Sequence, residues 1–117
     1  MPVLDTPSLT RLARYLDLTA MRQTLIASNL ANVDTPRYRT RDVNFRAELN
    51  RALQPGDAPL TPASHPVIGL LERPDGNNVS VDRESLLMAE TQLRFRSAIE
   101  LVRAEFRRLL SAINEGK

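Results

Sequence analysis

The sequence of 117 residues contains no cysteine and no tryptophan, and only four glycines and one histidine. The absence of cysteine excludes disulfides, thiolate zinc sites and cysteine nucleophiles. No histidine pair has HxxxH or HxH spacing, no glycine-rich phosphate loop is present, and no serine lies in a GxSxG elbow. We therefore expect no catalytic residue, no metal site and no cofactor, and the sequence argues against an enzyme.

The aspartates and the histidine do not change this expectation. Asp34 with Asp42, or Asp75 with Asp82, could form a carboxylate pair, but each aspartate is also a typical turn or helix-cap residue. His65 lies within a proline-rich stretch, and we interpret it as an exposed loop residue rather than a ligand.

Long apolar runs are also missing. No run approaches about 18 residues, the length that crosses a bilayer as a helix, and the N-terminus lacks a basic region followed by an apolar one. We expect no direct membrane span and no conventional secretion signal. The net charge of +2 is too small to indicate nucleic acid by itself. Large apolar anchors are scarce, with three phenylalanines and two tyrosines, so we expect the isolated chain to be loosely packed.

Two long stretches do have helical periodicity. Residues 7–33 predict a helix with Thr6 as N-cap and Pro7 at the first position, and residues 82–113 predict a second helix with Asp82 as N-cap. In both, apolar residues recur at alternating spacings of three and four, which is typical of a coiled-coil seam. The first seam reads Leu9, Leu12, Leu16, Thr19, Gln23, Ile26, Leu30 and Val33. The second reads Met88, Gln92, Phe95, Ile99, Val102, Phe106, Leu109 and Ile113.

This seam is either an intramolecular core or an assembly surface. A further apolar set lies off the first seam, at Leu18, Met21 and Leu25, and one partner helix would not cover both sets. Together with the shortage of aromatic residues, this second set favours assembly.

Residues 34–81 have a different composition. Residues 54–66 contain four prolines and predict an irregular, extended segment, whereas Val67–Val81 predicts a small β-hairpin around the turn-forming "ERPDGNN". We therefore expect a mainly α fold in a single domain over residues 1–117. Paired N- and C-terminal coiled-coil-like helices would be joined by an extended, proline-rich segment with a small β-hairpin.

The basic arm "RYRTRDVNFR" (residues 37–46) permits another interpretation. Its arginines could grip a phosphate backbone while an aromatic ring stacks on a base. However, Asp42 interrupts the arm, no known DNA-binding motif accompanies it, and alternating arginines also fit the solvated face of a strand. We expect no nucleic-acid partner, and a basic helical nucleic-acid-binding or regulatory protein remains the alternative from a different class.

The stretch "RQTLIASNLANVDTPRYRTRDVNF" (residues 22–45) resembles the N-terminal signature of bacterial flagellar rod and hook proteins. That signature is a helix ending in Asn-x-Ala-Asn-x-x-Thr-Pro-Gly-Tyr. The matching residues are Asn29, Ala31, Asn32, Thr35, Pro36 and Tyr38. Arg37 stands where the family usually has glycine, which implies either a strained residue or a different turn. "RDVNF" and "DGNNVSVDRE" resemble the proximal rod members of the family in particular.

The resemblance implies a structural subunit of the proximal rod. Such a subunit would be exported uncleaved by the flagellar type III apparatus, self-associate in the periplasmic rod of the basal body and transmit torque from the MS ring to the distal rod. Implied partners are the export gate, the MS ring, FliE, and FlgC with other rod proteins. "FRAEL" matches the family's export-gate element through Phe45 and Leu49. Another axial protein such as FlgC is the alternative within the family.

The signature also has a physical interpretation as a helix stop. Asn29 and Asn32 can satisfy carbonyls at the end of the helix or adopt the left-handed conformation. Thr35 before Pro36 must leave helical space, and Tyr38 offers a ring to pack and a hydroxyl to bond. We expect this stop to fix the angle at which the arm leaves the helix.

Overall fold

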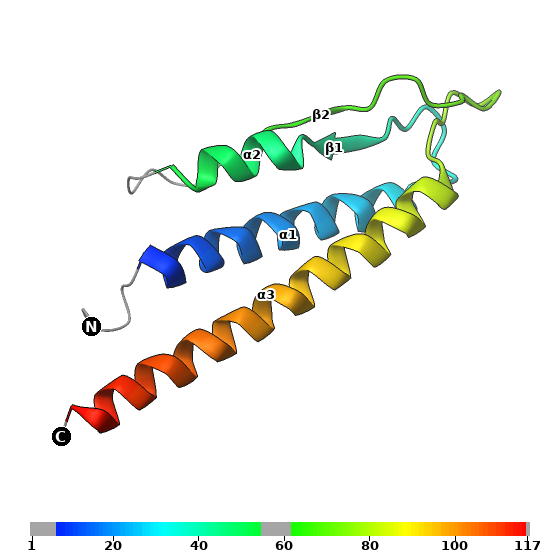
Figure 1. Ribbon diagram of the computed structural model, residues 1–117. Helices are drawn as coiled ribbons and strands as arrows, with labels where there is room; N and C mark the ends of the chain where they lie inside the picture. The colour runs from blue at the N-terminus through cyan, green and yellow to red at the C-terminus, as the bar shows by residue number, and fades with distance from the viewer. Residues whose placement is uncertain (1–6, 55–61, 117) are drawn as a thin grey trace.

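The computed structural model describes residues 7–54 and 62–116. The helices are α1 (Pro7–Ala31), α2 (Phe45–Ala52) and α3 (Val81–Glu115), and the strands are β1 (Arg41–Val43) and β2 (Ser64–Pro66). The two long helices pack side by side in opposite directions, and α2 with the strands lies along the other side of α1 (Figure 1). The described chain is mainly helical and elongated, with extents of 69 × 25 × 18 Å.

The two long helices lie close to their predicted positions, but their ends differ. α1 starts at Pro7 as expected, and Thr6, the predicted N-cap, lies outside the described residues. The helix stops at Ala31 rather than residue 33, where the side-chain amide of Asn32 donates to the carbonyl of Ser28 at 2.8 Å. This bond satisfies one of the carbonyls that the last turn leaves without a helical partner.

The predicted N-cap of α3 was wrong. Ser80 has extended backbone angles and its hydroxyl accepts a hydrogen bond from the amide of Arg83 at 3.2 Å, so Ser80 is the cap. Asp82 instead lies in the first turn, where its negative charge stabilises the positive end of the helix dipole. The helix continues to Glu115, two residues beyond the prediction.

Residues 45–52 form α2, a helix that was not predicted from the sequence. Asn44 caps this helix by accepting a hydrogen bond from the amide of Ala47 at 3.2 Å. Phe45, Glu48 and Ala52 recur at helical spacing and are all buried, so the helix places one face against the rest of the chain.

The small antiparallel sheet is present, but its predicted location was wrong. β1 pairs with β2 in the register Arg41 to Pro66 and Val43 to Ser64, which places His65 on a strand rather than in a loop. No strand forms over residues 67–80; instead, the amide of Gly76 donates to the carbonyl of Arg73 in a tight turn. Of the asparagines that follow, Asn77 bonds to the turn after α1 and Asn78 bonds to Tyr38 and Thr40, and these contacts replace a hairpin ladder.

The core between α1 and α3 is small and is centred beside the predicted seam. Its buried residues are Leu18, Thr19, Ile26 and Asn29 on α1 and Glu84, Thr91 and Ala98 on α3. Among the predicted seam residues, Thr19 and Ile26 are buried. Those that are half-buried are Leu9, Leu12, Leu16, Gln23, Leu30, Val33, Met88, Phe95, Ile99, Val102 and Leu109. Within one chain, the predicted seam is therefore only partly covered.

The C-terminal end of α3 extends past the start of α1 (Figure 1). α3 has 35 residues against 25 in α1, and the first turns of α1 face α3 near Glu105 and Arg108. Phe106, Leu110 and Ile113 are 41%, 59% and 47% exposed. No helix in the described ranges is long and apolar enough to cross a membrane.

Candidate functional site

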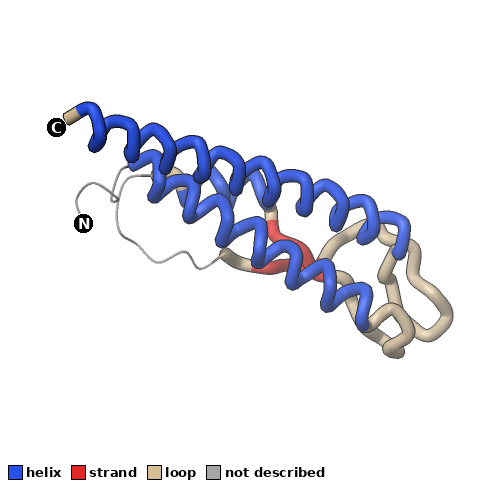
Figure 2. The backbone as a smooth tube through the Cα atoms, turned by 90° about the horizontal axis from the view of Figure 1, so that it is seen from below, coloured by secondary structure: helices blue, strands red, loops and turns tan. Residues whose placement is uncertain are grey.

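The end of α1 and the start of α3 meet in a region that we call the polar junction, comprising residues 28–42 and 73–84. Figure 2 shows these two helix ends and the connecting loops gathered at one end of the molecule. The junction contains most of the family signature predicted from the sequence, together with "DGNNV" from the other side of the chain. Hydrogen bonds from side chains and from the backbone link these two segments.

Asn29 is the centre of the junction. Its side chain is 1% exposed, and its Nδ2 donates to the carbonyl of Arg41 at 2.8 Å and to Oε2 of Glu84 at 3.2 Å. Its Oδ1 accepts from the hydroxyl of Tyr38 at 2.9 Å and from the amide of Arg41 at 3.2 Å. All four hydrogen-bonding positions of the amide are used. The expectation that Asn29 would serve the carbonyls at the helix end was therefore wrong, because it lies inside α1 and joins three segments.

A chain of charged groups continues from Glu84. Arg83 donates to Glu84 at 2.6 Å and to Asp42 at 2.9 Å, and Arg22 forms two hydrogen bonds of 3.2 Å with the same Asp42 carboxylate. The Asp42 side chain is 7% exposed. Burial alone would raise the pKa of Asp42, but hydrogen bonds from Arg22, the amide of Val43 and Arg83 outweigh it, and the pKa lies below its ordinary value.

Asn77 closes the turn that follows α1. Its side chain is fully buried, and its Nδ2 donates to the carbonyls of Asn32 at 2.9 Å and Thr35 at 2.8 Å. Arg73 donates to the carbonyl of Val33 from the same segment. The hydroxyl of Thr35 in turn donates to Oδ1 of Asn32 at 3.0 Å. The carbonyls of the turn that follows α1 are thus satisfied by residues about forty positions away.

Arg37 occupies the left-handed region, with φ of 65°. The sequence left open whether Arg37, which stands where the family usually has glycine, is strained or belongs to a different turn. The structure shows the first, because the left-handed conformation is strained for a residue with a side chain. The amide of Arg37 donates to the carbonyl of Asp75 at 2.9 Å, and a Cβ atom added to Gly76 would lie 3.3 Å from the Arg37 Cα. Gly76, with φ of +83°, allows this close approach between the two halves of the junction.

The other signature residues lie on the surface of the junction. Ala31, Thr35 and Pro36 are exposed, whereas Asn32 and Tyr38 are half-buried. The residues that sequence reasoning missed are Arg22, Thr40, Asn77, Asn78, Arg83 and Glu84. Asp42 was interpreted as a turn or cap residue, which was wrong because it is the acceptor of two arginines. The signal that could have found some of them is the unusual pair of asparagines in "DGNNV".

The proposed export element lies on the inner face of α2. Phe45 is 8% exposed, and its ring meets that of Tyr15 edge to face, with centroids 5.8 Å apart. The guanidinium carbon of Arg94 lies 4.9 Å from the ring centroid, and that of Arg22 lies 5.6 Å from it. Leu49 is half-buried one turn further along. Phe45 and Leu49 therefore anchor α2 to the helix pair in the folded chain.

No constellation suited to metal binding is found in residues 7–54 and 62–116, as no group of three or more His, Asp or Glu side chains converges there. The arginines of the basic arm are partly engaged. Arg39 pairs with Glu72 at 3.3 Å, and Arg41 bonds to the side chain and carbonyl of Ser64.

We predict that Asp42→Asn lowers the free energy of unfolding by about 2 to 3 kcal/mol at pH 7, because the hydrogen bonds from Arg22 and Arg83 lose their charged acceptor. Since the folded-state pKa of Asp42 is lowered, its contribution is present above about pH 3.9 and is lost as the pH falls through the folded-state value. Urea unfolding at several pH values should therefore show the difference between wild type and variant shrinking in acid.

Glu90→Gln is the matched control. The ion pair of Glu90 with Arg94 is exposed, with side chains 43% and 39% accessible, so its removal should change stability by less than about 1 kcal/mol. A constant difference between wild type and Asp42→Asn from neutral to acidic pH would contradict the assigned role of Asp42.

Comparison with known proteins agrees with the sequence signature. A family model described as "Flagella basal body rod protein" matches residues 16–39, which span the second half of α1 and its stop. The flagellar basal body rod protein FlgB of Cereibacter sphaeroides is 35% identical, over 86% of this chain and 89% of the relative. The corresponding proteins of Yersinia enterocolitica and Salmonella typhimurium are 30% and 29% identical, over 86% of this chain and 89% and 88% of theirs. The chain therefore belongs to the family of the flagellar basal body rod protein FlgB.

Proposed function

We propose that the chain is a structural subunit of the proximal rod, which assembles with other rod and basal body components through its two long helices. The observation that carries this proposal is the exposed apolar end of α3. Phe106 lies level with the first turns of α1, and Leu110 and Ile113 follow toward the helix end that extends past α1 (Figure 1). Clustered apolar side chains on a protein surface are typical of an interaction site. A second apolar set on α3, at Leu86, Leu93 and Leu101, is 58–70% exposed.

The polar junction supports a mechanical role in this proposal. Asn29 bonds α1 to the segment that leaves it and to α3, and the ion pairs of Asp42 join the same three parts. Directional hydrogen bonds restrict rotation between elements more than apolar contacts do. A subunit with such a joint would transmit torque from the MS ring to the distal rod without changing the angle between its helices.

The proposed neighbours are FliE and the MS ring on one side and FlgC with later rod proteins on the other, and the proposed location is the periplasmic rod. Nucleic-acid binding has less support, because Asp42 interrupts the basic arm and Arg41 already bonds to Ser64 within the chain. If the chain instead takes the place of FlgC in the rod, its neighbours would be rod proteins alone. Cross-links from the chain to FliE and the MS ring would favour the proximal position.

We also propose that the chain is read by the flagellar export gate before it folds. The reason is the burial of Phe45 between Tyr15 and Arg94 in the folded chain. If "FRAEL" is the element that the gate recognises, the folded subunit hides its aromatic side chain. Export of an unfolded chain, followed by folding at the growing rod, removes this conflict.

We predict that Phe106→Asp blocks incorporation into the rod while secretion continues. Phe106 is 41% exposed, so the change should alter the stability of the free chain by only about 0.5 kcal/mol. Once a neighbouring subunit covers this position, an unpaired carboxylate would cost about 3 to 5 kcal/mol. The measurement is the amount of chain in isolated basal bodies and in the secreted fraction of a strain that depends on it.

Ser111→Asp is the control, because Ser111 is exposed and lies on the opposite side of α3 from Phe106. Normal motility of the Phe106→Asp strain, or equal loss of motility in both strains, would contradict assembly through the apolar end of α3.

We predict that Phe45→Ala combined with Leu49→Ala leaves the subunit in the cytoplasm. The change removes two apolar groups four residues apart, which a gate could read on one turn of helix. Fractionation of a strain blocked after the proximal rod would give the ratio of secreted to cytoplasmic chain. Arg46→Ala with Asn50→Ala, on the exposed face of α2, is the control and should be secreted normally. Equal secretion of the Phe45/Leu49 variant and wild type would remove the export role of "FRAEL".

A further inference from the structure

The most exposed large apolar side chains in the described chain lie together in one loop. Ile68 is 94% exposed and Leu71 is 89% exposed, whereas the next, Leu86, is 70% exposed. Gly69 between them has φ of +88°, and no atom lies within 4 Å of the position that its Cβ would occupy. We call residues 68–71 the knob. Nothing within the described residues covers it, although exposure of two neighbouring aliphatic side chains to water is unfavourable.

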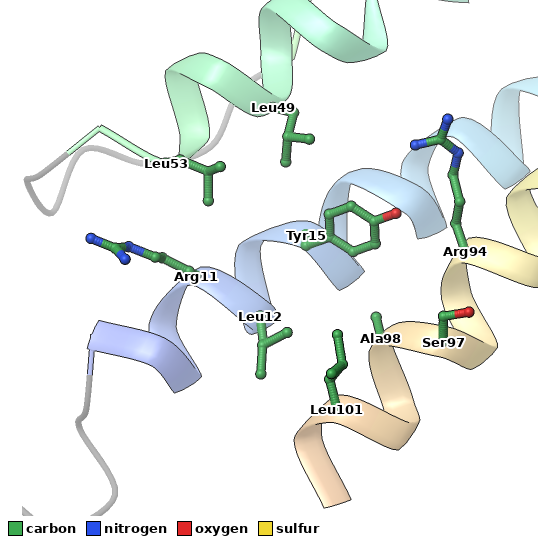
Figure 3. Close-up of a pocket in the computed structure, with 9 residues that line it drawn as sticks. All are labelled: Arg11, Leu12, Tyr15, Leu49, Leu53, Arg94, Ser97, Ala98 and Leu101. Atoms are coloured by element: carbon green, nitrogen blue, oxygen red, sulfur yellow. The ribbon is translucent and has the colours of Figure 1, made fainter. Parts of the chain in front are cut away.

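A pocket of complementary character lies between the three helices (Figure 3). Its apolar lining comes from all three, with Leu12 and Tyr15 from α1, Leu49 from α2, and Leu101 from α3; Leu53, just after α2, completes it. The cavity holds about 210 Å³. An apolar cavity of roughly 150 Å³ accommodates a group the size of benzene. The volume therefore suits one or two aliphatic side chains and is too small for the face of a helix.

The charges beside the knob and the pocket are opposite in sign. Glu72 follows the knob directly, and its pair with Arg39 is half exposed on both sides, so exchanging that partner costs little. Arg11 lies at one end of the pocket (Figure 3) and has no ion-pair partner among residues 7–54 and 62–116. Arg94, at the other end, already pairs with Glu90. Arg11 is thus available for Glu72 of an incoming knob.

The knob and the pocket lie far apart on the same molecule (Figure 1). The knob is beside the start of α3, whereas the pocket residues Ser97 and Leu101 lie roughly 24 to 30 Å further along that helix. A knob cannot fill the pocket of its own chain. A contact between different patches on identical subunits repeats from copy to copy, and it produces a ring if its rotation closes and a helical filament if it does not.

We propose that the knob of one copy inserts into the pocket of the next copy, with Glu72 pairing with Arg11. This inference rests on the proposed function, because a rod needs a contact that repeats from subunit to subunit. It adds to the packing of the long helices a second, lateral contact that sets the position of one subunit along its neighbour.

The absence of native cysteine makes a disulfide test specific. In the doubly substituted chain Leu71→Cys with Ser97→Cys, the contact brings the two cysteines of neighbouring copies together. A disulfide requires Cα atoms within about 7 Å, so none can form inside one chain. Mild oxidation of the concentrated, purified chain should give a ladder of dimers, trimers and higher multiples. The matched control is Leu71→Cys with Ser111→Cys, because Ser111 is also exposed and lies outside the pocket.

The outcomes separate this inference from the proposed function. A ladder that depends on Ser97→Cys supports the knob contact. Absence of the ladder, dimers alone, or an equal ladder in the control overturns it. Presence of the chain in isolated basal bodies is scored separately. If the chain is found there without the ladder, the inference fails and the proposed function stands; if the ladder forms but basal bodies lack the chain, the proposed function fails.

Discussion

The buried side chain of Asn29 is the interaction on which the arrangement of this chain depends. It lies on α1, yet its hydrogen bonds go to Tyr38 and Arg41 in the segment that leaves the helix and to Glu84 on α3. A buried amide costs free energy unless its donors and acceptors are satisfied, so the three segments are stable only when they meet at it in one geometry. The aliphatic core between α1 and α3 is too small to impose that geometry by itself. The family signature therefore does more than stop a helix, because its first asparagine fixes the angle between the helix pair and the arm.

The long helices and the signature turn could be predicted from the sequence, but their long-range partners could not. The periodicity of apolar residues predicts α1 and α3 and places their ends within about two residues, because a helical repeat sustained over many turns is a strong signal. The eight residues of α2 are too few for such a signal, and neither this helix nor its cap Asn44 was predicted, although the pair Phe45 and Leu49 was recognised. Asn77 could be recognised as a turn residue, but its bonds to Asn32 and Thr35 depend on tertiary contact. The strand at Ser64–Pro66 was missed for the same reason, because its pairing with Arg41–Val43 spans about twenty residues.

The predicted seam and the observed core differ in an informative way. On α3, the small residues Thr91 and Ala98 are buried, whereas the larger Leu86, Leu93 and Phe106 are exposed to solvent. A monomeric helical protein would instead bury its large side chains and expose its small ones. The chain thus combines a rigid polar joint at one end with uncovered apolar surface along the rest of its length. This combination suits a subunit whose fold is completed by its neighbours, and the burial of Phe45 places any recognition of that side chain before folding.

The central claim is that Asn29 fixes the arm to the helix pair, and hydrogen exchange of individual amides in the Asn29→Ala variant tests it most directly. The amide of Arg41 donates to Asn29, and that of Thr40 donates to Asn78 beside it, whereas Leu18 and Ile26 lie within α1. Opening of local segments is reported by exchange without unfolding of the whole molecule. The account predicts that protection is lost over residues 38–43 while Leu18 and Ile26 remain protected. Retained protection of residues 38–43, or an even loss across the whole chain, would contradict it.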